Sequence, residues 1–268
     1  MRFNLSGAGF TAILFAVVFT FSCVPKRKMV YLQPEEGQNA DSLYQYQRTS
    51  YRLQKGDILS IDVVSLEEEA NEIFTASKGR QVNQNIQNGG DLYYMSGYSI
   101  NDSGFVSIPI VGGVKVEGLT LEEAKQRIDE LLKKFFSLYF LNVKLGGLRF
   151  TALGEFKAPG KYVILQNQAT IFEAIAMAGD LEMVASRSDV KLIRQYPGGT
   201  KIHEVNLLDQ SIIQSPFYFI QPNDVIYVEP LPAKSWGIGV SGAQTATLVI
   251  SIVTSALLLY TTIVTLNR

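Results

Sequence analysis

A long run of uncharged residues near the end of the chain constrains its fold more than any other feature. No Asp, Glu, Lys or Arg occurs between Lys234 and Arg268, a stretch of 33 residues. As an α-helix, residues 237–266 would be about 45 Å long, which exceeds the ~30 Å hydrocarbon core of a bilayer. Trp236 and Arg268 stand where interfacial anchors are usually found. We therefore expect a C-terminal helix in 233–268 that spans a membrane.

The residues of this helix are sorted by polarity around its axis. When residues 241–265 are placed 100° apart, eight of their ten Ser, Thr and Gln residues fall in an arc of about 120°. A lone anchor surrounded by lipid needs no such face, whereas a helix between lipid and water, or between lipid and protein, does. A helix packed on one neighbour is an alternative, but the wide arc favours a ring of helices around a wet path. The residues expected to line that path are Gln244, Thr247, Ser251, Thr254, Thr261 and Thr265.

The beginning of the chain has the features of an export signal. Arg2 precedes a short apolar run over residues 10–21, which is the length of a secretory h-region. Cys23, the only cysteine of the chain, follows this run directly after a small residue. This order is similar to a bacterial lipoprotein cleavage site. We expect 1–22 to be a signal peptide and 23–50 a tether lipidated at Cys23, although a cysteine that merely ends an anchor is the alternative.

Composition argues against several classes of function. The 24 Lys and Arg residues nearly balance 25 Asp and Glu residues, so the basic footprint of a nucleic-acid-binding protein is missing. One Cys and one His are too few for a disulfide framework or for most Cys and His metal sites. No spacing of carboxylates nominates a catalytic pair. We expect no enzyme activity, no catalytic residue, no cofactor and no metal.

Residues 51–232 contain two short β-rich units of the α+β class. In each unit, alternating apolar residues predict strands, and Gly56-Asp57 in the first unit and Pro159-Gly160 in the second predict turns. Each unit also has a capped helix, for which Thr120 and Thr170 are the expected N-caps, and residues 65–98 of the first unit are expected to form a long surface loop with partial helix at 67–74. We place the boundary between the units so that they cover 51–147 and 148–232.

The order of motifs resembles the outer-membrane polysaccharide export family, the Wza-like lipoproteins. Tyr51, Leu53, Gly56 and Asp57, followed by DSGFVSIPIVGGVKVEGLTLEEA at 102–124, look like its polysaccharide export domain. The segments at 151–164, 170–180 and 223–230 are similar to a soluble-ligand-binding β-grasp (SLBB) domain. The resemblance implies a homo-octameric ring, lipid-anchored in the bacterial outer membrane, with its β domains in the periplasm.

The resemblance also implies a function. The ring would conduct a capsular or exopolysaccharide from the periplasm to the cell surface, supplied by an inner-membrane polysaccharide co-polymerase or chain-length regulator. An alternative from another class is a membrane-anchored glycan-binding or scaffold lipoprotein without a pore. The terminal helix separates the two, because only a pore requires its polar arc to face water.

Overall fold

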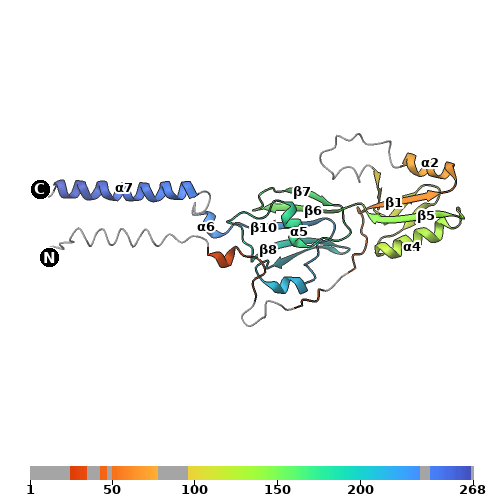
Figure 1. The fold of residues 1–268 in the computed structure, drawn as a ribbon, viewed down its shortest axis with the longest axis horizontal. Helices are drawn as coiled ribbons and strands as arrows, with labels where there is room; N and C mark the ends of the chain where they lie inside the picture. The colour runs from red at the N-terminus through yellow and green to blue at the C-terminus, as the bar shows by residue number, and fades with distance from the viewer. Residues whose placement is uncertain (1–24, 35–42, 47–49, 78–95, 236–241, 267–268) are drawn as a thin grey trace.

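The computed structural model describes residues 25–34, 43–46, 50–77, 96–235 and 242–266. Two β-rich domains and a terminal helix follow one another along the long axis of the molecule (Figure 1). The first domain contains β1 (Ile58–Ser65), α2 (Glu68–Ser77), β2 (Tyr98–Ser99), β3 (Phe105–Ile108), β4 (Gly112–Lys115), α4 (Leu121–Leu132) and β5 (Tyr139–Leu145). The second contains β6 (Leu148–Gly154), β7 (Gly160–Ile164), α5 (Ile171–Met177), β8 (Val190–Tyr196), β9 (Gly199–Val205), the 3-10 helix η2 (Gln210–Gln214) and β10 (Asp224–Val228). The short helices η1 (Lys26–Lys28) and α6 (Pro232–Ser235) and the terminal α7 (Gly242–Leu266) complete the chain. The expected α+β class is confirmed.

The first domain packs helices α2 and α4 against a small antiparallel sheet. The sheet has the order β2-β1-β5, and β3 and β4 form a separate hairpin. Strand β1 buries Leu59, Ile61 and Val63 at every second position, as a half-buried strand does. Helix α4 contributes a buried face of Ala124, Ile128 and Leu132 to the same core.

The spacing of Leu121, Ala124, Ile128, Leu131 and Phe135 predicts one buried face of α4, and Phe135 is placed differently. The helical spacing predicts that Phe135 continues the buried stripe, but its side chain is half exposed. Helix α4 ends at Leu132, so the helical periodicity stops one turn earlier than the sequence pattern suggests. Phe136 instead enters the core, where its ring lies 6.3 Å from that of Phe74.

The second domain has a five-stranded mixed sheet with the order β7-β6-β10-β8-β9. Its central pair, β6 and β10, is parallel, with Asp224 opposite Phe150. Helix α5 buries Ile171, Ala174 and Ile175 in a core that is separate from that of the first domain. The two domains are connected by the short link between β5 and β6, residues 146–147.

Segments that precede the first domain lie along the second domain. Tyr31 donates a hydrogen bond of 2.7 Å to Asp180 Oδ1, and the Tyr44 hydroxyl lies 2.5 Å from Gln210 Oε1. The ring of Tyr46 meets Phe219 edge to face, with centroids 5.4 Å apart. The described parts of the expected tether, 25–34 and 43–46, are therefore held against the second domain.

Both expected N-caps form complete capping boxes. Thr170 Oγ1 accepts from the Glu173 backbone N–H at 3.1 Å, and Glu173 Oε2 accepts from the Thr170 N–H at 2.6 Å. The same reciprocal pair joins Thr120 and Glu123 at 3.2 and 2.7 Å. These bonds occupy N–H groups that a helix start otherwise leaves without partners.

The caps give a direct test of the fold. We expect Thr170→Ala to lower the free energy of unfolding by about 1 kcal/mol, because one orphan N–H loses its acceptor. Thr170→Ser keeps the hydroxyl and is the matched control. Chemical denaturation of both variants measures the effect, and an unchanged midpoint for Thr170→Ala would show that the cap does not stabilise α5.

Candidate functional site

The two domains meet through a pair of similar turns, each of which leads into a central strand. Residues 54–57 precede β1, and residues 221–224 end at the first residue of β10. In both turns the third residue has a left-handed backbone, with φ +84° at Gly56 and φ +66° at Asn223. Gly and Asn are the residues that adopt this conformation at least cost. In both, the fourth residue is a buried aspartate.

The first of these aspartates, Asp57, is held by its own turn. Its Oδ2 accepts from the Gln54 backbone N–H at 2.8 Å and from the Tyr51 hydroxyl at 2.6 Å. Its Oδ1 has no hydrogen-bond partner among the described residues. Burial raises the pKa of Asp57, while these two bonds and the positive charge of Arg149 lower it in part. Burial and Asp57 together raise the pKa of the Tyr51 hydroxyl, which stays protonated as a donor.

The second aspartate, Asp224, has a cation beside it. Arg194 donates to both of its carboxylate oxygens, from Nε at 3.0 Å and from Nη2 at 2.7 Å, and neither side chain is more than 3% exposed. Asp224 Oδ2 also accepts from the Gln221 N–H at 2.7 Å, and Arg194 Nη2 donates to the Phe219 carbonyl at 3.0 Å. One buried ion pair therefore fixes the loop that leads into β10.

Backbone hydrogen bonds tie the second turn to β6, and the start of β1 to the link between β5 and β6, each within its own domain. The Asn223 N–H donates to the Arg149 carbonyl at 2.7 Å, and the Gly146 N–H donates to the Ile58 carbonyl at 2.7 Å. Gly146 has to be a glycine, because a Cβ there would lie 2.8 Å from Ile58 Cγ2 and 3.0 Å from its carbonyl oxygen. The link between the domains is thus short and tightly packed.

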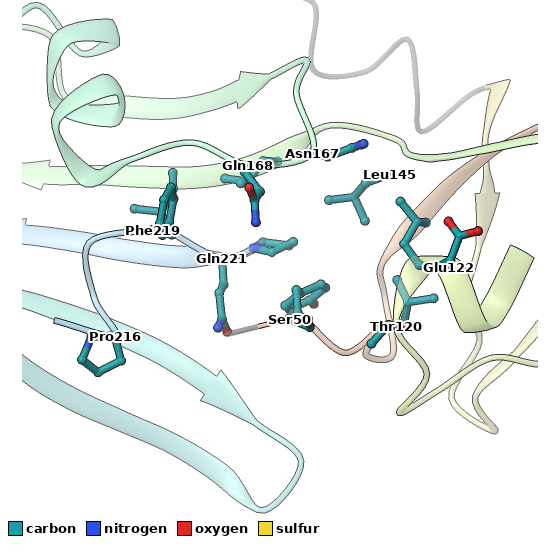
Figure 2. Close-up of a pocket in the computed structure, with 15 residues that line it drawn as sticks. Ser50, Thr120, Glu122, Leu145, Asn167, Gln168, Pro216, Phe219 and Gln221 are labelled. Carbon is teal, nitrogen blue, oxygen red and sulfur yellow. The ribbon is translucent and has the colours of Figure 1, made fainter. Parts of the chain in front are cut away.

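A cavity of about 330 Å³ lies between the domains, beside this junction (Figure 2). Its walls come from the segment before β1, the start of α4, the ends of the β5–β6 link, the loop before α5 and the loop before β10. The lining residues are Ser50, Tyr51, Leu53, Thr120, Leu121, Glu122, Leu145, Leu148, Asn167, Gln168, Pro216, Phe219, Ile220, Gln221 and Pro222. It has the mixed lining of a small-molecule site.

Helix α7 extends away from both domains (Figure 1). Almost all of its described side chains are exposed, with Val253 and Ala256 half-buried. Hydroxyls on the predicted polar face donate to carbonyls of the preceding turn: Thr254 to Ile250 at 2.9 Å, and Thr265 to Thr261 at 2.9 Å. Their protons are therefore used within the helix, and their oxygen lone pairs point outward as acceptors.

The structure changes what was expected of the C-terminal segment. The predicted helix is present over Gly242–Leu266. Among the described residues, no helix combines the length and apolarity that crossing a membrane requires. The prediction rested on the whole uncharged run, whereas the helix covers only its later part, in which hydroxyl residues recur among apolar ones. In that part lie Gln244, Thr247, Ser251, Thr254, Thr261 and Thr265.

The other predicted residues lie in different places. Cys23 falls outside the described residues. Gly56 and Asp57 form the junction turn described above, which makes them part of the domain boundary as well as a turn. Pro159 is exposed and Gly160 begins β7, far along the chain from the junction. Within the described residues, no group of three His, Cys, Asp or Glu side chains is arranged to hold a metal ion.

Sequence reasoning did not find Arg194, Gly146 or the cavity. Arg194 occurs in a strand whose alternation marks it as buried, which is a signal for a buried cation that needs a partner. For its partner, Asp224, the sequence Gln221-Pro222-Asn223-Asp224 predicts only a turn. Gly146-Gly147 between two apolar runs marks a close backbone approach. The cavity has no signal in the sequence, because its walls come from five separate segments.

Comparison with known proteins gives consistent matches. The family model of polysaccharide biosynthesis/export proteins matches residues 45–146. The EPS I polysaccharide export outer membrane protein EpsA of Ralstonia solanacearum is 27% identical over 201 residues, which cover 74% of this chain and 52% of that protein. The protein of the same description from Ralstonia nicotianae is 28% identical over 185 residues, or 68% of this chain and 48% of its own. The chain spans about half the length of these relatives, and the expected resemblance to this export family is confirmed.

The buried carboxyl of Asp57 predicts a pH dependence. Because its pKa is raised in the folded state, its contribution to stability is fully present below the unfolded pKa of about 3.9 and is lost as pH rises through the folded pKa. We expect the stability of the wild type relative to Asp57→Asn to fall as pH increases from 4. Tyr51→Phe removes a bond that lowers this pKa, so the loss should move to higher pH. Denaturation across pH 4–8 measures both, and parallel curves for the wild type and Asp57→Asn would contradict the assignment.

Proposed function

Because residues 45–146 match the polysaccharide biosynthesis/export family, we propose that the chain exports a capsular or exopolysaccharide across the outer membrane. The observation that carries this proposal is that match, extended by the relatives named as export proteins over a further part of the chain. Export requires a path across the membrane and a driving force, and α7 is the element that we propose for the path.

We place α7 in a ring of copies of the chain. In a ring, each helix turns one face to lipid and the other to water, so no helix has to be apolar all round. The hydroxyl face carries Thr254, Thr261 and Thr265, and the opposite face carries Val253, Leu257 and Tyr260. These hydroxyl groups donate their protons within the helix. Their oxygen atoms can therefore act only as weak hydrogen-bond acceptors, from which water molecules and sugar hydroxyls can dissociate readily.

The width of such a path follows from helix packing. Helices packed side by side lie about 10 Å apart, so eight of them form a circle about 25 Å across at the helix axes. Subtracting about 10 Å for the thickness of a helix leaves a lumen on the order of 15 Å. That lumen admits one hydrated glycan strand. The stoichiometry of eight is carried over from the family resemblance.

The remaining parts of the proposal concern position and partners. Acylation of Cys23 would hold the chain at the outer membrane, with the two β domains in the periplasm. The packing of residues 25–34 on the second domain supports this arrangement, because these residues follow the expected anchor in the sequence and lie against the domain that α6 follows. An inner-membrane co-polymerase or chain-length regulator would supply the polysaccharide.

A scaffold lipoprotein without a pore is the competing function. It explains the anchor and the β domains equally well, but it gives no reason for the hydroxyl face of α7. The two functions differ in whether that face meets water, and this difference can be measured.

Deletion of the gene tests the export function itself. We expect surface polysaccharide to fall in the deletion strain and to return with the wild-type chain. A chain ending at residue 235, which keeps both β domains, should not restore it, because it lacks α7. Quantified cell-surface polysaccharide is the readout, and a deletion strain with undiminished surface polysaccharide contradicts the proposal.

Cysteine labelling tests the wet path. We expect a membrane-impermeant thiol reagent to label Thr254→Cys in assembled complexes and to spare Val253→Cys, because the two side chains lie about 100° apart around the helix. The parent protein gives the baseline, since Cys23 is expected to be acylated. Equal labelling at 253 and 254 would remove the pore and leave the scaffold function.

A further inference from the structure

The cavity between the domains is lined in part by five polar side chains, of which that of Gln221 is half-buried and the others are exposed. Asn167, Gln168 and Gln221 bring carboxamides to its wall, and Ser50 and Glu122 add a hydroxyl and a carboxylate. Within the described residues, none of these five side chains forms a hydrogen bond or an ion pair. A carboxamide both donates and accepts, so the wall offers several free donors and acceptors from both domains (Figure 2).

The rest of the lining is apolar and partly aromatic. Tyr51 directs its hydroxyl to Asp57, which leaves its ring as the part that can meet a ligand. Phe219 is half-buried, and its ring is held by edge-to-face contacts with Tyr46 and Tyr218 at 5.4 and 5.1 Å. Aromatic rings beside groups that both donate and accept suit a ligand with apolar faces and a rim of hydroxyls.

Hydrogen bonds hold the backbones of the two loops that carry Gln168 and Gln221. Arg194 donates to the Phe219 carbonyl and is paired with Asp224, which in turn accepts from the Gln221 N–H. The Ile220 N–H donates to the Ala169 carbonyl at 3.0 Å, which ties the loop before β10 to the loop that carries Gln168. A preorganised wall loses less freedom when a ligand binds.

Charge narrows the class of ligand. Glu122 is the one lining residue, among the fifteen named above, with a carboxylate or a cationic side chain. A ligand with its own carboxylate would meet repulsion and would find no cation in the wall. The volume of about 330 Å³ is near the lower end of the ~300–1,000 Å³ found for small-molecule sites, so the cavity fits a short unit.

We propose that this interdomain cavity is a binding subsite for a neutral or N-acetylated sugar unit, and that it disfavours uronic acids. The proposal rests on the export function, because it makes the cavity a holding point for a segment of the exported chain. The sugar ring contacts Tyr51 and Phe219, and its hydroxyls bond to the carboxamides of Asn167, Gln168 and Gln221.

Ligand-observed saturation-transfer NMR on the full chain in detergent tests the subsite. The probes are cellobiose, N,N′-diacetylchitobiose and glucuronic acid. We expect transfer to at least one of the two disaccharides and little to glucuronic acid. The double variant Asn167→Ala/Gln168→Ala should weaken disaccharide binding about tenfold or more, since each lost hydrogen bond costs a few-fold in affinity. Gln214→Ala, an exposed amide of the same domain, is the control and should bind as the wild type does.

Removal of the carboxylate charge from the cavity wall tests separately whether the subsite disfavours uronic acids. Glu122→Gln should increase transfer to glucuronic acid, whereas Glu130→Gln, an exposed residue of the same helix outside this cavity, should not. Absence of transfer to both disaccharides, or equal affinity in the double variant and the wild type, overturns the subsite. An unchanged response to glucuronic acid in Glu122→Gln overturns its selectivity. Neither result tests the export function, which is tested by the amount of surface polysaccharide in the deletion strain.

Discussion

The buried pair of Arg194 and Asp224 is the interaction on which the arrangement of the second domain depends. Both side chains are almost fully buried, and the pair is doubly hydrogen-bonded. Removing one partner of such a pair leaves an uncompensated buried charge, which typically costs 3–5 kcal/mol. Because Arg194 also holds the Phe219 carbonyl, the pair fixes the loop before β10, and with it one wall of the interdomain cavity.

Both domains bury an aspartate at the end of a turn, but the two carboxylates have different hydrogen-bond partners. Each places an aspartate at the end of a four-residue turn with a left-handed third residue, and each aspartate accepts from the N–H at the start of its turn. Asp224 receives a full cation, whereas Asp57 receives a tyrosine hydroxyl and keeps one oxygen without a partner among the described residues. A cation therefore faces the carboxyl group on one side of the junction and an uncharged hydroxyl faces the carboxyl group on the other, and burial raises the pKa of both aspartates.

Local rules in the sequence identified the elements well and their assembly poorly. Thr120 and Thr170 were identifiable as caps because a capping box is specified within four residues. Gly56-Asp57 was identifiable as a turn for the same reason. The parallel pairing of β6 with β10 joins residues more than 70 positions apart, and Arg194 meets Asp224 across 30 positions. Such pairings follow from the packing of the whole domain, as does a cavity whose walls come from five segments. Phe135 shows the limit of periodicity, since the pattern continued past the end of its helix.

The central claim is that several copies of the chain form one complex around a path for the glycan. The mass of the full-length chain extracted from membranes in mild detergent tests it most directly, measured by native mass spectrometry or mass photometry. The account predicts one closed complex of several copies, near eight times the mass of the lipidated chain. A monomer under conditions that keep both β domains folded would contradict it.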